Sequence, residues 1–329
     1  MIKSILFVSI VSFLVSLIAL PWLIKYLRKI ELFVIDQNKE NKPLVPISGG
    51  LAVAASITAS FMALIFFKTF FQPLSLETSI TIFAVIASLL MVTFIGFIDD
   101  VLIKKSKDSS YGLKQWQKPL LTLFAAIPLM AVKVGETTMT IPFLGTFNFG
   151  LLYPLLIVPI GFIGATNMVN LLAGFNGSEA GMGLVYTSML GIYAYVNGSY
   201  VASVLAFAAF SALLVFFIFN FYPAKVLPGD SLTYLLGAVI ASIAIVGNIE
   251  KAALIAAVPF MIEFILKARS KFRAQSYGFY KDGKIQSIHE KKIYSIPHIL
   301  TRTGKYTEKQ VTLFMILVQF IFAGLIWVI

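Results

Sequence analysis

The sequence contains no cysteine, and only 12% of its 329 residues are charged. Without cysteine, the chain has no disulfide, no zinc-thiolate site and no cysteine nucleophile. Soluble domains carry about 25% charged residues, so the low charge content excludes an ordinary soluble domain. A hydrophobic fraction of 59% and a mean hydropathy of +0.90 indicate a protein of the lipid bilayer.

Motifs of several other protein classes are also missing. No Walker loop or kinase-type glycine loop is present, so ATP hydrolysis has no support. No internal repeat suggests the inverted halves of a transporter. Although the net charge is +11, the charges lie between apolar runs. A membrane surface explains them better than nucleic acid, which we do not expect as a partner.

Ten apolar stretches approach the roughly 20 residues that a helix needs to cross a bilayer. They predict an all-α polytopic membrane protein, with residues 1–329 in a single membrane-embedded domain. Residues 137–150 differ, because they alternate and turn at Gly145, which predicts a small β-hairpin on the membrane surface. The predicted spans are 4–24, 48–67, 79–98, 117–132, 150–169, 181–197, 199–221, 232–247, 250–267 and 310–329.

The charged residues indicate how the chain is oriented. The loops that follow the odd-numbered spans contain most of the charged residues. Together with the residues at the edges of these loops, they hold 22 of the 26 lysines and arginines and 11 of the 15 acidic residues. The positive-inside rule places these loops in the cytoplasm and both termini outside. A transporter would keep ionisable groups near the bilayer midplane, whereas these spans are almost bare of them. This distribution favours an enzyme that acts at the inner surface of the cell membrane.

Adjacent aspartates end the third span in the motif GFIDDVL. Asp99 and Asp100, at a helix C-terminus, oppose the helix dipole and repel each other, and a cation would relieve both costs. A helix end that reaches into water is the simpler alternative. Neighbours on a helix point about 100° apart, so the two carboxylates need not share one partner.

A neutral, glycine-rich loop follows the fifth span in the stretch NMVNLLAGFNGSEAG. Asn167 and Asn170 share a helix face, and Asn176 follows in a turn-prone stretch, with Glu179 beyond it. A helix C-cap and turn would explain the glycines but not three asparagines beside a membrane interface. Amide groups bind Mg²⁺, a sugar or a phosphate without adding charge.

The other inner loops supply further candidates. The stretch NFYPAKVLPGDS contains Asp230, the one acidic residue of its loop. Lys118 stands where a lipid phosphate would lie, and snorkelling to the lipid surface explains it equally well. The remaining candidates in these loops are Asp36, Gln37, Asn38, Lys39 and Asn220.

The last inner loop, 268–309, is long and basic. Arg269 and Arg273 suit diphosphate or sugar oxygens. His289 and His298 lie nine residues apart, which does not favour zinc, and a structural role for each is the leading interpretation. Carboxylates, amides and cations on one face together indicate Mg²⁺-assisted phosphoryl transfer at the inner membrane surface.

These motifs resemble those of the polyprenyl-phosphate N-acetylhexosamine-1-phosphate transferases, in glycosyltransferase family 4. The matching stretches are DQNK, GFIDDVL, NMVNLLAGFNGSEAG and NFYPAKVLPGDS, over residues 36–231. The sequence resembles most the archaeal and eukaryotic branch that makes GlcNAc-diphospho-dolichol. Two departures stand out: this chain has Pro46-Ile47 where that branch has Pro-Glu, and its last loop lacks a clear Arg-His-Arg signature.

The resemblance implies transfer of N-acetylglucosamine-1-phosphate from UDP-GlcNAc to a polyprenyl (dolichyl) phosphate, with release of UMP. It implies Mg²⁺, with Mn²⁺ as an alternative, at Asn170 and Asp230. It assigns Asn176, Asp36 and Gln37 to the nucleotide sugar, and Lys118 with residues 163–171 to the lipid phosphate. We expect Asp99 to act as a base or to orient the acceptor, and Asp100 to support the metal or a lysine.

Several alternatives stay open at the sequence level. The same reaction with another UDP-N-acetylamino sugar is the nearest one, and a lipid or solute transporter is the alternative from a different class. A two-step route through an aspartyl-phosphate is a further possibility. The oligomeric state is not determined by the sequence, and a homodimer is one expectation.

Overall fold

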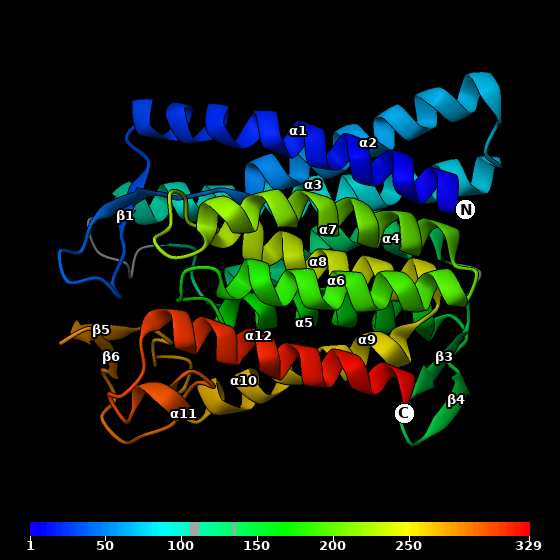
Figure 1. Cartoon of the computed structure of the whole chain (residues 1–329). Coiled ribbons are helices and arrows are strands. Elements are labelled where there is room, and N and C mark those ends of the chain that lie inside the picture. Colours follow the sequence, from blue (N-terminus) through cyan, green and yellow to red (C-terminus); the bar gives the residue numbers. More distant parts are fainter. Residues whose placement is uncertain (106–111, 134–135) are drawn as a thin grey trace.

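Long helices lie side by side along one direction, and the loops gather at the two ends of the bundle (Figure 1). The computed structural model describes residues 1–105, 112–133 and 136–329, without the side chains of residues 104 and 105. Seven helices in this described part are long and apolar enough to cross a membrane. They are α1 (Ile2–Lys29), α2 (Gly50–Phe71), α3 (Leu76–Lys105), η1 with α5 (Tyr153–Ile157 and Val158–Leu171), α7 (Tyr200–Asn220), α8 (Gly229–Gly247), and α12 with η2 (Glu308–Gly324 and Leu325–Trp327).

The other predicted spans are shorter or less apolar helices. They are α4 (Gln117–Val132), α6 (Ser178–Val196), α9 (Glu250–Ala256) and α10 (Val258–Ala268). The single span predicted over 250–267 is therefore wrong, because two short helices meet at Ala257. Pro259 lies in the first turn of α10, where its missing N–H favours the start of a helix over its continuation. A helix or helix pair occupies each of the ten predicted stretches.

Both termini lie at one end of the bundle, which also carries a small hairpin (Figure 1). This hairpin confirms the prediction for 137–150, since β3 (Thr138–Ile141) pairs antiparallel with β4 (Gly145–Asn148). Gly145 turns the chain with φ of 97°, in a region that glycine enters without strain. The shared position of the termini agrees with an even number of crossings.

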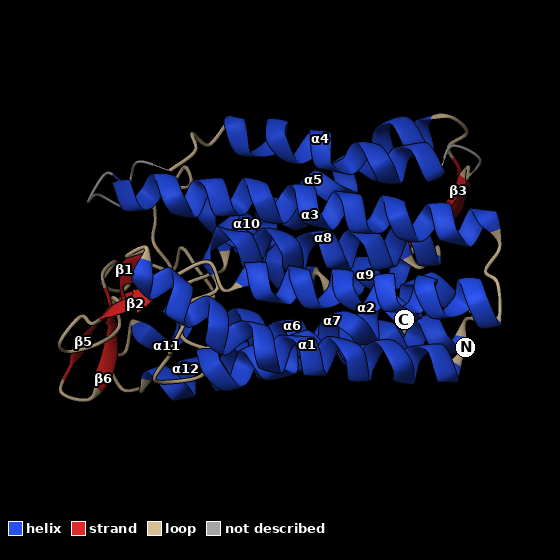
Figure 2. Ribbon diagram, turned by 90° about the horizontal axis from the view of Figure 1, so that it is seen from above, coloured by secondary structure: helices blue, strands red, loops and turns tan. Residues whose placement is uncertain are grey.

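The opposite end carries the remaining strands and a short helix, as Figure 2 also shows. Here β1 (Phe33–Ile35) pairs with β2 (Leu44–Pro46), and β5 (Gly278–Lys281) pairs with β6 (Lys284–Ser287), both antiparallel. The short helix α11 (His298–Thr301) follows. The basic loop 268–309 is thus folded rather than extended, which its composition did not predict.

Helix α8 lies at the centre of the bundle (Figure 1), and most of its residues are buried. Glycines on α8 and on its neighbour α3 allow these helices to pack closely. A Cβ at Gly96 of α3 would collide with the backbone of Asp230 and Ser231, and one at Gly237 of α8 would collide with the backbone of α5. Small residues let helix backbones approach in this way inside membranes. The start of α8 is therefore held against the end of α3.

Candidate active site

Three charged side chains meet where the ends of α3, α4 and α8 converge. The Lys118 ammonium lies 2.6 Å from Asp99 Oδ2 and 3.0 Å from Asp230 Oδ2. The Asp99 side chain is fully buried, and the other two are largely buried. One cation thus neutralises part of the charge of two carboxylates that would otherwise repel each other. Asp99 Oδ1 also accepts a hydrogen bond from the Leu113 N–H at 2.5 Å.

An oriented amide completes this charged cluster. Asn170 Nδ2 donates to Asp230 Oδ2 at 3.2 Å, and Asn170 Oδ1 accepts from the Thr233 hydroxyl at 2.9 Å. The structure therefore brings together Asn170 and Asp230, which the resemblance assigned to one metal site. Asn167 lies one turn earlier, where its amide donates to Thr122 Oγ1 at 3.2 Å and to the Ile163 carbonyl at 2.9 Å.

Asp100 points to different partners from its neighbour Asp99. Its buried carboxylate accepts the backbone N–H of Asp230 at 2.7 Å, that of Ser231 at 3.3 Å and the Ser48 hydroxyl at 2.7 Å. It therefore caps the first turn of α8, where free N–H groups and the helix dipole favour an anion. A Cβ at Gly229 would collide with this carboxylate. The described contacts give Asp100 a role in placing Asp230.

A cavity of about 770 Å³ opens beside the charged cluster. Its walls come from the β1 region, the end of α5 with the following loop, the start of α8, and the segment 272–277 of the basic loop. Six of the predicted site residues line it: Asp36, Gln37, Asn170, Asn176, Glu179 and Asp230.

A second polar network holds the wall formed by Asn176. Asn176 Nδ2 donates to Asp36 Oδ2 at 2.9 Å, and the same oxygen lies 3.1 Å from Lys39 Nζ. Lys39 also pairs with Glu308 at the start of α12, and Glu308 Oε1 accepts the Asn176 N–H at 3.0 Å. Glu308 was not among the site residues predicted from the sequence. Its position in the first turn of the last span was the one signal available.

Three other candidates shape the glycine-rich loop itself. Asn38 Nδ2 donates to the Gly174 carbonyl at 2.6 Å, and Glu179 Oε1 accepts the Gly174 N–H at 2.8 Å. Asn220 Oδ1 accepts the Gly177 N–H at 3.0 Å. These polar side chains thus provide hydrogen-bond partners for backbone groups of the loop. The loop is partly buried, and buried backbone N–H and C=O groups need such partners.

The four candidates of the basic loop do not line the cavity in the described structure. Arg269 and Arg273 are exposed. His298 is buried, with Nδ1 accepting the Tyr294 N–H at 3.2 Å and Nε2 placed 3.0 Å from the Gln275 carbonyl. Burial lowers the pKa of His298 to about 4, and the nearby charges of His289 and Lys267 act in the same direction.

His289 is a neighbour of His298 rather than a cavity residue. Its half-buried ring lies 5.2 Å from that of His298, measured between ring centroids. Desolvation also lowers the pKa of His289. Burial thus disfavours the charged form of both histidines.

The donor atoms at the cavity suit a hard divalent cation. Asp230 offers a carboxylate at the cavity, and the Asn170 amide beside it donates through Nδ2 to that carboxylate while its Oδ1 accepts from the Thr233 hydroxyl. Among the described residues no group of three or more His, Asp or Glu side chains is placed to hold a metal. Mg²⁺ commonly uses one or two carboxylates and completes its octahedron with water and phosphate oxygens. The residues present fit such an ion, and Mn²⁺ would accept the same oxygen ligands.

The helices and this cavity with its charged cluster define a polytopic membrane protein with a charged site at one end of its bundle. The chain belongs to glycosyl transferase family 4, whose model matches residues 82–248. That range runs from α3 to the end of α8 and includes Asp99, Lys118, Asn170 and Asp230. The family resemblance of the sequence motifs is confirmed.

Curated relatives cover nearly the whole chain. A Saccharolobus solfataricus protein, provisionally named a UDP-N-acetylglucosamine–dolichyl-phosphate N-acetylglucosaminephosphotransferase, is 33% identical over 98% of this chain and 95% of its own. A Dictyostelium discoideum protein with that enzyme name is 26% identical over 86% of this chain and 78% of its own. A Shouchella clausii phospho-N-acetylmuramoyl-pentapeptide-transferase is 34% identical over 79% of this chain and 80% of its own.

Proposed function

We propose that the protein transfers N-acetylglucosamine-1-phosphate from UDP-N-acetylglucosamine to a membrane polyprenyl (dolichyl) phosphate and releases UMP. The observation that carries this proposal is the cluster of Lys118, Asp230 and Asn170, of which Asn170 and Asp230 line the cavity. The names of the relatives that cover most of the chain support the same substrates. The product, GlcNAc-diphospho-polyprenol, would begin the assembly of a lipid-linked glycan.

The cavity suits a nucleotide sugar as the donor. Its volume of about 770 Å³ lies within the roughly 300–1,000 Å³ typical of small-molecule sites. Asp36 and Asn176 offer hydrogen-bonding groups in its lining, and Asp230 lines the same cavity. A donor bound across the cavity would place its diphosphate beside Lys118 and Asp230.

Helix α4 suits a lipid phosphate as the acceptor. Lys118 lies in its first turn, and the same helix exposes an apolar row of Leu120, Phe124 and Ile127. These residues follow one another at spacings of four and three, so they form one stripe along the helix. A polyprenyl chain lying on this stripe would bring its phosphate to the Lys118 ammonium.

The chemistry requires little proton transfer. A phosphate monoester has a second pKa of roughly 6, so the acceptor is largely a dianion at pH 7. Its oxygen forms a bond to the β-phosphorus, the bond from that phosphorus to the bridging oxygen breaks, and UMP leaves with the electron pair. Electrostatic stabilisation and positioning then supply most of the rate enhancement.

The side chains of this protein would hold and orient the reacting groups. Lys118 binds phosphate charge, and Asp99 fixes the ammonium through the 2.6 Å contact. Because Asp99 is also held by the Leu113 N–H, its contacts favour orientation of Lys118 over nucleophilic attack, and hence a one-step route. Mg²⁺ held by Asp230 and Asn170 would neutralise the charge that develops on the leaving phosphate.

The reaction would take place on the cytoplasmic face of the cell membrane. The end of the bundle that holds the cavity also carries the basic loop 268–309. Lysine and arginine excess marks the cytoplasmic side of membrane proteins. The cavity would therefore meet the nucleotide sugar in the cytoplasm.

A reconstituted assay tests the proposed function. Purified protein is mixed with a polyprenyl phosphate, Mg²⁺ and one of several UDP-sugars, and the released nucleotide is identified. We expect UMP with UDP-N-acetylglucosamine, in an amount equal to the diphospholipid formed, and none when the lipid phosphate or the divalent cation is withheld. Release of UDP, or turnover independent of lipid phosphate, would contradict the proposal.

A further inference from the structure

A buried ion pair lies on α10, outside the charged cluster of the proposed reaction. Glu263 and Lys267 are one helical turn apart, with Lys267 Nζ 3.7 Å from Glu263 Oε1. Their side chains are 0% and 5% exposed. Such a buried pair contributes little net stability compared with apolar residues of similar size. Its use therefore has to be sought in the contacts that the two groups make.

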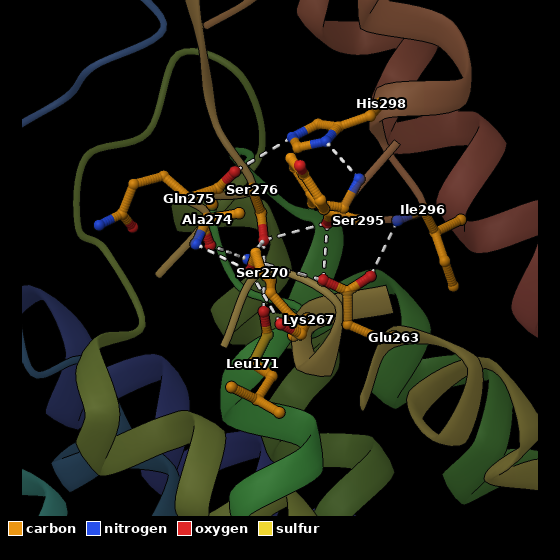
Figure 3. Close-up of polar contacts among 12 residues, drawn as sticks. Leu171, Glu263, Lys267, Ser270, Ala274, Gln275, Ser276, Ser295, Ile296 and His298 are labelled. Atoms are coloured by element: carbon orange, nitrogen blue, oxygen red, sulfur yellow. Dashed lines mark hydrogen bonds and ion pairs between the residues drawn. The ribbon is translucent and has the colours of Figure 1, made fainter. Parts of the chain in front are cut away.

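Lys267 binds the segment that forms one wall of the cavity. Its ammonium donates to the Ala274 carbonyl at 2.7 Å and to Ser276 Oγ at 2.8 Å. Ser276 Oγ in turn donates to the carbonyl of Leu171 at 3.2 Å, at the end of α5 (Figure 3). Leu171 directly follows Asn170, whose amide contacts Asp230. The contacts therefore link α10 to the end of α5 next to the charged cluster.

Glu263 binds a second segment of the basic loop. Its Oε1 accepts the Ser295 hydroxyl at 2.6 Å, and its Oε2 accepts the Ile296 N–H at 2.8 Å (Figure 3). His298 adds a direct contact between the two segments, since its Nε2 lies 3.0 Å from the Gln275 carbonyl. Two distant parts of the loop thus converge on one helical turn of α10.

The segment held in this way is part of the cavity. Ala274, Gln275, Ser276 and Tyr277 line it together with Lys267, and Asn170 and Asp230 line the same space. The Lys267 ammonium is already occupied by protein oxygens. Its geometry is that of a group that fixes the wall rather than one that binds phosphate.

We propose that the Glu263–Lys267 pair is a positioning device that sets the distance between the 274–277 wall and the end of α5, and thereby the fit of the donor substrate. This inference rests on the proposed function for the identity of that substrate. Displacement of the wall weakens donor binding first, because the groups around Asp230 keep their own contacts. Neither residue is assigned a chemical step.

Charge removal in a matched set of variants tests this role. Lys267→Met leaves Glu263 as an unpaired buried charge, and we expect KM for UDP-N-acetylglucosamine to rise about tenfold while kcat changes less than about threefold. Glu263→Gln/Lys267→Met removes both charges, and we expect most of the affinity to return. Lys267→Arg keeps the charge and should stay near the wild type. A Lys267 that binds phosphate directly would leave the double variant as impaired as Lys267→Met, which would overturn the proposal.

A control pair is available at the other end of the bundle. Lys133 and Glu136 form a Lys–Glu contact of 3.2 Å in which Glu136 is 42% exposed. Lys133→Met/Glu136→Gln should leave KM and kcat unchanged. Ser276→Ala provides a second probe that keeps both charges but removes the link to Leu171. It should also raise KM, and it remains usable if Lys267→Met does not accumulate in membranes.

A measurement of wall mobility separates this inference from the proposed function. The chain has no cysteine, so a spin label on Gln275→Cys reports on a single position of the wall. We expect a restricted spectrum in the otherwise wild-type protein, a more mobile one with Lys267→Met or Ser276→Ala, and restriction again with the double variant. Unchanged spectra in both single variants would refute the positioning role. If the wild type released no UMP, the proposed function would be refuted, and the spectra would still decide the positioning role of the Glu263–Lys267 pair.

Discussion

Lys118, in the first turn of α4, lies 3.0 Å from Asp230, in the first turn of α8, although 112 positions separate them. A cation at a helix N-terminus opposes the helix dipole, whereas an anion there is favoured. Asp230 is thus placed where its own helix stabilises it, and it offsets the unfavourable position of Lys118. Because the N-terminus of α4 is an unfavourable position for a cation, we infer that the charge of Lys118 serves the function of the site.

Replacement of Lys118 tests that use. Lys118→Met removes the cation between Asp99 and Asp230, so these carboxylates repel each other and phosphate charge is no longer bound. We expect kcat/KM for UMP release to fall by about a hundredfold or more, since misplaced reacting groups alone cost that much. Lys114→Met, at an exposed position four residues earlier, is the matched control and should retain activity. Near-normal turnover in Lys118→Met would remove Lys118 from the mechanism.

Loss of the Asp230 carboxylate should abolish transfer without unfolding the protein. Asp230→Ala removes the charged oxygen ligand offered to Mg²⁺, and changes even in the surroundings of metal ligands cost about 10–100-fold in affinity or activity. The checks are UMP release over a Mg²⁺ titration and the melting temperature in detergent. Asp282→Asn is a suitable control, because it removes an exposed carboxylate in the β5–β6 turn, where Asn followed by Gly is favoured. Full activity of Asp230→Ala would refute its metal role.

The neighbours Asp99 and Asp100 should respond differently to substitution. Asp99→Asn keeps an acceptor for the Leu113 N–H but loses the charge that orients Lys118, so activity should fall with little change in stability. Asp100→Ala removes the acceptor for two backbone N–H groups of α8. Loss of a helix cap costs about 1–2 kcal/mol, so its melting temperature should fall together with activity. Equal stability of the two variants would contradict the capping role of Asp100.

The buried His298 predicts a pH dependence of stability. Its pKa in the folded protein is about 4, below the ordinary value of 6.5, because burial disfavours the charged ring. Folding then requires a neutral ring, so this contribution is fully present above pH 6.5 and is lost as the pH falls from 6.5 toward 4. The loss amounts to roughly 3 kcal/mol.

Thermal melting between pH 7.5 and pH 4.5 measures this effect. The wild type should lose stability over the acidic half of that range, because a protonated Nδ1 can no longer accept the Tyr294 N–H. His298→Asn should show a flatter profile with a lower starting stability. Parallel profiles for the two proteins would mean that another group is responsible.

The sequence predicted the helical stretches well because lipid leaves the backbone few choices. Every N–H and C=O in the bilayer core needs a partner within the protein, so a long apolar run forms a helix. The break at Ala257 was missed because hydropathy does not register an interruption of the helix within a continuous apolar run. The strand pair β1–β2 was missed because each strand is only three residues long. The pair β5–β6 was missed because its loop was interpreted by its basic charge, although Asp282-Gly283 is a hairpin-turn signal.

Some candidates were identified by their surroundings in the chain, but their roles were not. The aspartate pair stood out as adjacent charges at the predicted end of a span, although α3 continues to Lys105. The capping of α8 by Asp100 joins residues 130 positions apart and gave no such signal. Glu308 gave almost no signal, since its partner Asn176 lies 132 positions away. Glu263 and Lys267 are near each other in sequence, but the loop segments that they hold could not be inferred from spacing.

The sequence by itself determined that this protein crosses a membrane and carries its polar chemistry at one end, because hydropathy and charge act locally along the chain. Only the tertiary structure decided which polar groups face one another across the cavity. Hydrogen bonds and ion pairs reach about 3 Å, and contacts this short depend on the packing of helices that are distant in sequence. The pairing of Lys118 with Asp230 follows from that packing.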